Sequence, residues 1–134
     1  MKVLLDTNVI LDVWLAREPF WRDSAKLLGL VESQKIEAIV SPTSVTTLYY
    51  LAHKVLGDAK ARSLVDSLLR ICAIGEMYKS TFQSALGNQT KDYEDAVLVA
   101  LAEAQNLDYI ATRNLKDFRN SKVQALEPAE LVLK

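Results

Sequence analysis

The chain has 134 residues, of which 50% are hydrophobic and 25% charged, and its formal net charge is −1. The length suits one domain, because a second domain would need at least about 50 residues of its own. The composition is that of an ordinary globular protein. The near-neutral charge and a pI of about 5.8 argue against a broadly basic nucleic-acid-binding surface.

The sequence carries no signal of a membrane or secretory location. No apolar run approaches the roughly 20 residues of a membrane-spanning helix, and the start MKVLLDTN lacks the pattern of a signal peptide. The single cysteine, Cys72, excludes an internal disulfide and suits a reducing compartment. We therefore expect a cytoplasmic protein with no membrane partner.

Short apolar runs alternate with helical patterns along the chain. The apolar runs predict strands at Lys2 to Leu5, Glu37 to Val40, Ile71 to Ile74, Asp108 to Ala111 and Val123 to Leu126. Caps and apolar periodicity predict helices from Thr7 through Trp14, Trp21 to Glu32, Pro42 to about Gly57, Asp58 to Arg70, Met77 to Leu86, Asp92 to Gln105, and after Pro128. This alternation predicts a single α/β domain over residues 1–134: a three-layer α/β/α sandwich with a central parallel sheet.

Acidic and amide side chains occur at three comparable places. Asp6 ends the first apolar run, Asp92 and Asp95 open a very apolar helix, and Asn114 and Asp117 follow the run Tyr-Ile-Ala. Because the carboxyl ends of parallel strands share one edge, we expect these groups to converge on one crevice. Carboxylates gathered there repel one another unless a cation lies among them. Oxygen ligands suit Mg²⁺ or Mn²⁺, and such a site suggests hydrolysis of phosphate esters.

A simpler explanation exists for each cluster by itself. Asp6 and Asp92 are also good helix caps, and Asn114 and Asp117 are also turn residues. The three-residue spacing puts Asp92 and Asp95 on one side of the first helical turn. The intervening Glu94 is expected to point elsewhere. The joint occurrence of the three clusters favours a site over capping alone.

Other chemistries have little support. The lone His53 and Cys72 exclude a zinc ligand set, and no Ser-His-Asp signature or glycine-rich phosphate loop is present. Four basic residues lie beside the third acidic cluster: Arg113, Lys116, Arg119 and Lys122. They are either ordinary surface charges or contacts to phosphate.

Four segments of the chain resemble the PIN-domain (PilT N-terminus) family of metal-dependent ribonucleases. They are VLLDTNVI at 3–10, SPTSVTTLYY at 41–50, DYEDA at 92–96 and YIATRNLKDF at 109–118. The resemblance implies an RNase-H-like fold, one or two Mg²⁺ or Mn²⁺ ions held by acids, and endonucleolytic cleavage of RNA. It also implies, for many small members, a toxin role beside an antitoxin-like protein, and a homodimer. Aromatic residues in the N-terminal half, such as Trp14 and Tyr50, are compatible with such an interface.

The resemblance also implies roles for individual residues. Asp6 is expected to be the first metal ligand, Asp95 the central one and Asp92 a neighbouring acid. Asn114 or Asp117 completes the catalytic set. The residues expected to contact the substrate are Thr112 through its hydroxyl, Arg113 and Lys116 on the RNA backbone, and Thr47.

Thr47 marks a departure from the family pattern. PIN ribonucleases usually carry a glutamate at this position, just before the Leu-Tyr-Tyr stretch, and a neighbouring acid does not replace it here. Thr47 is then expected to act through a water-mediated contact. The alternative is a catalytically weak or inactive module with the same fold that binds RNA or a protein. A phosphoacceptor receiver domain fits less well, because receivers need adjacent acids after the first strand.

Overall fold

A computed structural model describes all residues, 1–134. Its centre is one five-stranded sheet in which every neighbouring pair is parallel, in the order β3-β2-β1-β4-β5. The strands are β1 (Lys2–Leu5), β2 (Glu37–Val40), β3 (Ala73–Ile74), β4 (Tyr109–Ala111) and β5 (Gln124–Leu126). The helices are α1 (Thr7–Trp14), α2 (Trp21–Glu32), α3 (Pro42–Leu56), α4 (Asp58–Ile71), α5 (Lys79–Leu86), α6 (Tyr93–Ala104), the 3₁₀ helix η1 (Leu115–Phe118) and α7 (Pro128–Val132).

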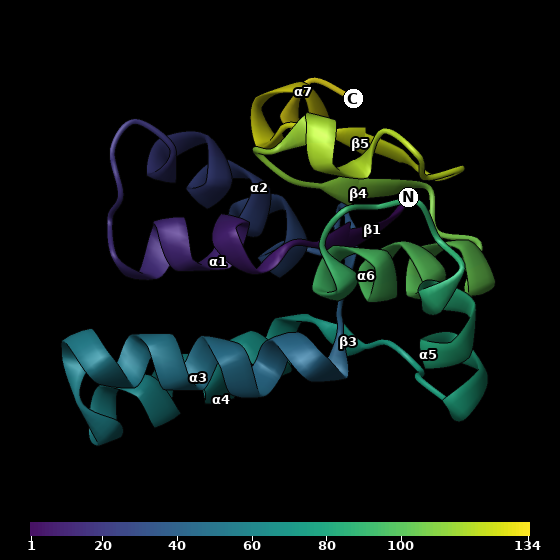
Figure 1. Ribbon diagram of the computed structural model, residues 1–134. Helices are drawn as coiled ribbons and strands as arrows, with labels where there is room; N and C mark the ends of the chain where they lie inside the picture. Colours follow the sequence, from purple (N-terminus) through teal and green to yellow (C-terminus); the bar gives the residue numbers. More distant parts are fainter.

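The two faces of the sheet bury different helices because side chains alternate along each strand. Val3 and Leu5 of β1 belong to a core shared with α1, α2 and α7, which the inner residues of α3 and α4 extend. Leu4, between them, belongs to a second core shared with α6. In Figure 1, α1 and α2 lie together away from α6, and α3 runs beside α4 as a pair. The predicted three-layer α/β/α sandwich is thus confirmed.

The central strand β1 is the place where the order of the strands reverses. From β1 the sheet grows to β2 and β3 on one side and to β4 and β5 on the other. Leu5 at the end of β1 pairs with Ala111 at the end of β4. The residues that follow these two strands therefore leave the sheet side by side, at the position where parallel sheets open a crevice.

The predicted elements are all present, with shifts of one or two residues at their ends. Ile71 remains helical, so β3 is shorter than expected, and the helix expected from Met77 begins at Lys79. The sequence did not predict η1, because a single turn of 3₁₀ helix has no apolar periodicity to mark it. No helix has both the length and the apolar character to cross a membrane.

Helix α6 is held by close packing against the chain that follows β3. A Cβ built on Gly75 would lie 2.8 Å from the Cδ2 atom of Leu101 in α6. Leu101 is fully buried, so a shift of its side chain would have to displace its neighbours in the core. Gly75 therefore fixes the distance between this segment and the helix that carries Asp95.

Replacement of Gly75 by alanine tests this packing. We expect Gly75→Ala to lower the free energy of unfolding by about 1–3 kcal/mol through overpacking, measured by urea denaturation. Gly29→Ala is the control, because a Cβ at Gly29 meets no atom within 4 Å and alanine favours a helix by up to about 1 kcal/mol over glycine. Equal stability of the two variants would contradict the proposed close contact.

Candidate functional site

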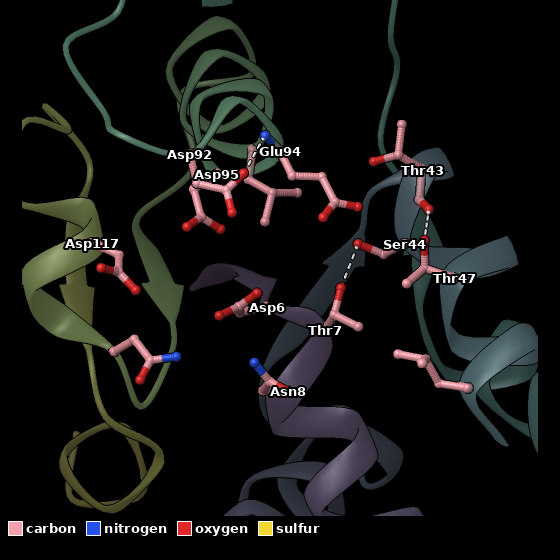
Figure 2. A pocket seen from close by; sticks show the side chains of 13 residues that line it. Asp6, Thr7, Asn8, Thr43, Ser44, Thr47, Asp92, Glu94, Asp95 and Asp117 are labelled. Carbon is pink, nitrogen blue, oxygen red and sulfur yellow. Dashed lines mark hydrogen bonds between the residues drawn. The ribbon is translucent and has the colours of Figure 1, made fainter. Parts of the chain in front are cut away.

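A cleft opens at the carboxyl ends of β1 and β4, with a volume of about 290 Å³. Only two of its 13 lining residues are hydrophobic, and the others carry oxygen or amide groups. Figure 2 shows side chains from α1, α3, α6 and the turn after β4 meeting around it. The five acids in its lining are Asp6, Asp92, Glu94, Asp95 and Asp117.

Asp6 forms the floor of the cleft. It follows β1 directly, its backbone N–H donates to the carbonyl of Ala111 at 3.0 Å, and its side chain is only 6% exposed. The Thr112 hydroxyl donates to its Oδ2 atom at 2.9 Å. Burial raises the pKa of Asp6, while the Thr112 hydrogen bond and the positive charge of Arg113 oppose this rise. Asp6 also precedes α1, but its side chain makes no capping hydrogen bond, so capping alone does not explain it.

Asp92 and Asp95 enter the cleft from the start of α6, on the same side as the sequence predicts (Figure 2). Asp92 does act as an N-cap, since one of its oxygens accepts from the N–H of Glu94 at 2.8 Å. Asp95 is half-buried and has no hydrogen-bond partner that would stabilise its charge. Its pKa is raised to about 7, mainly by burial and then by the negative charges of Asp6 and Asp92.

The expectation for Glu94 is wrong. Glu94 lines the same cleft, and in Figure 2 its carboxylate extends toward the α3 side, where Ser44 is drawn. Its negative charge also contributes to the raised pKa of Asp95. The helical angle between Asp92 and Glu94 is large, but the cleft surrounds the end of α6. A long side chain from the first turn therefore reaches the cleft from the other side.

Asn114 and Asp117 close the cleft opposite Glu94. Asn114 caps the short helix η1, in which the Asp117 N–H donates to the Asn114 carbonyl at 3.0 Å. Both side chains line the cleft, with Asp117 on the exposed rim. The turn explanation and the site explanation are therefore compatible, because the turn is what brings these side chains to the cleft.

Thr112 lies beneath the cleft, not on its surface. It is fully buried; its hydroxyl donates to Asp6 and accepts from the N–H of Asn114 at 3.1 Å. The expected contact between this hydroxyl and a substrate is thus not possible here. Thr112 instead joins the end of β1 to the turn after β4.

Arg113 also differs from the expectation of a free phosphate contact. Its Nε atom lies 2.9 Å from Oδ2 of Asp12, a side chain that is 0% exposed, and its guanidinium stacks over Phe20 at 4.2 Å. The Nε–H does not point at this oxygen, and neither atom has a hydrogen bond. The Nη2–H of Arg113 instead donates to Oδ1 of Asp12 at 3.4 Å. Arg17 lies 3.6 Å from the other oxygen of Asp12. Sequence reasoning missed Asp12 because it lies at an ordinary helical position in α1.

The α3 side of the cleft is formed by hydroxyl groups. The Thr7 hydroxyl donates to Ser44 at 3.1 Å, and the Thr47 hydroxyl donates to the carbonyl of Thr43 at 3.1 Å. Thr47 does line the cleft, but its donor is occupied and only the hydroxyl oxygen is free to accept. Glu94 is therefore the side chain that brings a negative charge to this part of the cleft.

The chemistry of the donor set in the cleft suits a hard divalent cation. It contains carboxylate and amide oxygens and no histidine or cysteine. No three acidic, histidine or cysteine side chains are close enough to ligate one ion directly. Mg²⁺ keeps several waters in its coordination shell, so ligation through waters or small shifts of exposed side chains would be needed.

The buried ion pair of Asp12 gives a first prediction for this site. Asp12→Ala leaves Arg113 and Arg17 without their shared carboxylate, and we expect a loss of about 3 kcal/mol in the free energy of unfolding. Asp66→Ala is the control, because Asp66 pairs with Arg70 on an exposed helix surface, where such pairs contribute about 0–1 kcal/mol. Chemical denaturation measures both variants, and similar losses would contradict an anchoring role for Asp12.

The raised pKa of Asp95 gives a second prediction. The folded protein keeps a proton on Asp95 up to about pH 7, whereas the unfolded chain releases it near the usual value of 3.8. The folded state therefore loses stability as the pH rises from about 4 to 7, and the full penalty remains above pH 7. Asp95→Asn removes this penalty. Without divalent cations we expect it to stabilise the fold at pH 8 by about 1 kcal/mol, after allowance for solvent screening.

Thermal unfolding at pH 8 and pH 5 measures this difference. The gain from Asp95→Asn should shrink at pH 5, where the native carboxyl of Asp95 is already protonated. A gain of the same size at both pH values, or a loss at pH 8, would contradict the prediction.

Comparison with known proteins shows which family this chain belongs to. The chain is 27% identical over 134 residues to Ribonuclease VapC1 of Aquifex aeolicus, covering 96% of this chain and 92% of that protein. The structure of VapBC2 from Rickettsia felis bound to a promoter DNA fragment superposes with a TM-score of 0.73 at 17% identity, covering 95% of this chain and 98% of that one. The sarcin-ricin loop cleaving toxin VapC20 of Mycobacterium tuberculosis superposes with a TM-score of 0.66 at 11% identity, covering 81% and 86%. The family model described as PIN domain matches residues 2–116, and the chain therefore belongs to the PIN domain family.

Proposed function

We propose that this protein is an endoribonuclease that hydrolyses RNA phosphodiester bonds with Mg²⁺ or Mn²⁺, as the toxin-like member of a toxin–antitoxin pair. The observation that carries the proposal is the meeting of five acids in one cleft at the reversal point of a parallel sheet. The similarity to Ribonuclease VapC1 supports the ribonuclease activity. The similarity to VapBC complexes supports an antitoxin-like protein partner.

The five acids differ in how firmly they are held. Asp6 is buried and oriented by Thr112, so it provides a fixed oxygen at the bottom of the cleft. Asp95 is half-buried and Asp92 is partly engaged as a cap. These three residues are the proposed cation ligands. They would hold a divalent cation, which would supply charge neutralisation at a phosphoryl group and a more acidic water.

The remaining groups are proposed to complete the catalytic set and to position the substrate. Asn114 and Asp117 present an amide and a carboxylate from the opposite wall, and Glu94 adds a carboxylate beside Ser44 (Figure 2). Thr47 offers a neutral acceptor oxygen that suits a water-mediated contact. Lys116 is exposed beside Asp117, where it contacts the RNA backbone. Thr112 and Arg113 act as positioning residues, through Asp6 and Asp12.

A second candidate function is a non-catalytic module that keeps the fold and binds RNA or a protein. It is favoured by the neutral Thr47 and by the absence of three acids in direct ligating positions. Calorimetric titration with Mn²⁺ separates the two candidates. Stoichiometric binding that is weakened in Asp6→Asn supports the nuclease, whereas no detectable binding supports the module. A homodimer is proposed for either case, and light scattering coupled to size-exclusion chromatography tests it.

Cleavage of a labelled RNA measures the proposed activity directly. We expect cleavage in Mg²⁺ or Mn²⁺, loss of cleavage in EDTA, and a fall of at least about 100-fold in Asp6→Asn and in Asp95→Asn, since each removes a charge at the reacting centre. Thr112→Val keeps Asp6 but frees its side chain, so a smaller fall is expected.

Glu32→Gln provides the matched control, because Glu32 is an exposed acid at the end of α2, outside the cleft. It should cleave RNA as the unmodified protein does. Cleavage that survives both EDTA and Asp95→Asn would overturn the proposed function.

A further inference from the structure

A second hollow lies beside the acidic cleft and shares part of its wall. Its volume is about 1020 Å³, and Asp92, Asp95 and Asp117 line both hollows. Lys91 enters it from the loop before α6, and Lys116 and Arg119 enter it from η1 and the residue after it. We call this second hollow the cationic groove, after these three side chains.

None of the three cations forms an ion pair with a carboxylate of the protein. The chain has six arginines, and five of them lie within 4 Å of a carboxylate: Arg17 and Arg113 at Asp12, Arg22 at Glu18, Arg62 at Asp58 and Arg70 at Asp66. Arg119 is the exception. Its Nε–H donates to the Lys116 carbonyl at 3.3 Å, and its terminal nitrogens have no carboxylate partner. Lys91 and Lys116 also form no ion pair.

The acids on the shared wall do not account for these cations either. Asp92, Asp95 and Asp117 face the same groove, yet none lies within salt-bridge distance of Lys91, Lys116 or Arg119. The cations are therefore available to an anion that enters from outside and lies next to the acidic cleft.

The groove also lacks the groups that hold nucleic-acid bases. None of its nine lining residues is hydrophobic, and none is aromatic. Proteins that grip unpaired bases usually stack them on aromatic side chains. Beside the three acids that it shares with the cleft, the lining has three cations and three neutral polar side chains, which suit the sugar–phosphate backbone instead.

We propose that the cationic groove holds the RNA strand beside the cleaved bond by its phosphates, through Lys91, Lys116 and Arg119, without stacking on its bases. This inference rests on the proposed function for the class of substrate. With a net charge of −1, the protein offers no general attraction for RNA, so binding depends on this local group of cations. Recognition in this part of the substrate is then independent of base sequence.

Fluorescence anisotropy with labelled oligouridylate in Mg²⁺ tests the groove, in an Asp95→Asn background that prevents cleavage. Each phosphate contact to a single strand contributes about −0.7 to the slope of log K against log salt concentration. Three contacts predict a slope of about −2. The triple variant Lys91→Ala, Lys116→Ala, Arg119→Ala should bring the slope near zero and weaken binding on the order of tenfold or more at low salt.

The control variant removes the same number of positive charges from outside the groove. Lys26→Ala, Lys35→Ala, Lys60→Ala removes three cations outside the groove and should leave both slope and affinity unchanged. Two modified probes separate phosphate from base: an abasic strand should bind like oligouridylate, and a neutral methylphosphonate strand should bind as weakly as the triple groove variant does to oligouridylate.

Three outcomes would contradict the proposed role of the groove. They are an equal loss of RNA affinity in the control variant, a loss of affinity for the abasic strand, and no binding of RNA at all. The two proposals fail separately. If the groove binds RNA but the unmodified protein does not cleave it, the proposed nuclease activity is wrong and the proposed role of the groove stands. If the triple groove variant cleaves RNA as the unmodified protein does, the proposed role of the groove is wrong and the nuclease activity stands.

Discussion

The burial of carboxylates close to one another is the constraint that the architecture of the cleft has to satisfy. Asp6 can remain 6% exposed because Thr112 donates to it and because the pairing of β1 with β4 places the two residues side by side. Without that hydroxyl, the buried carboxylate would lose the hydrogen bond that most opposes the cost of its desolvation. The same short contact sets the distance between the first and third acidic clusters. The hydrogen bond from Thr112 to Asp6 thus both stabilises the buried carboxylate and fixes its position relative to the turn after β4.

The ion pair between Asp12 and Arg113 also holds the turn after β4. Asp12 is fully buried and faces Arg113 and Arg17, while Arg113 also stacks on Phe20. Arg113 and Arg17 are therefore paired within the fold, and the cations proposed to bind a ligand lie in the neighbouring groove. This division explains how one short segment, Arg113 to Arg119, contributes to the fold at one end and offers free charge at the other.

The cleft is also a place where the charged form of a side chain lowers the stability of the fold. Asp95 is partly desolvated and surrounded by other acids, which raises its pKa to about 7. A neutral side chain there would suit the fold better, but it would not bind a cation. Conflicts of this kind, in which local rules of stability are broken, are typical of functional sites.

The sequence by itself determined the order of strands and helices, the parallel α/β/α class and the convergence of Asp6, Asp92 and Asp95. These features depend on apolar periodicity, on caps such as Ser41-Pro42 and on the geometry of parallel sheets, all of which are local or general. Only the tertiary structure decided the side on which Glu94 lies, the burial of Thr112 and the pairing of Arg113 with Asp12. Each of these depends on contacts between residues far apart in the chain. A side chain's direction and partners follow from packing between elements, which no local pattern encodes.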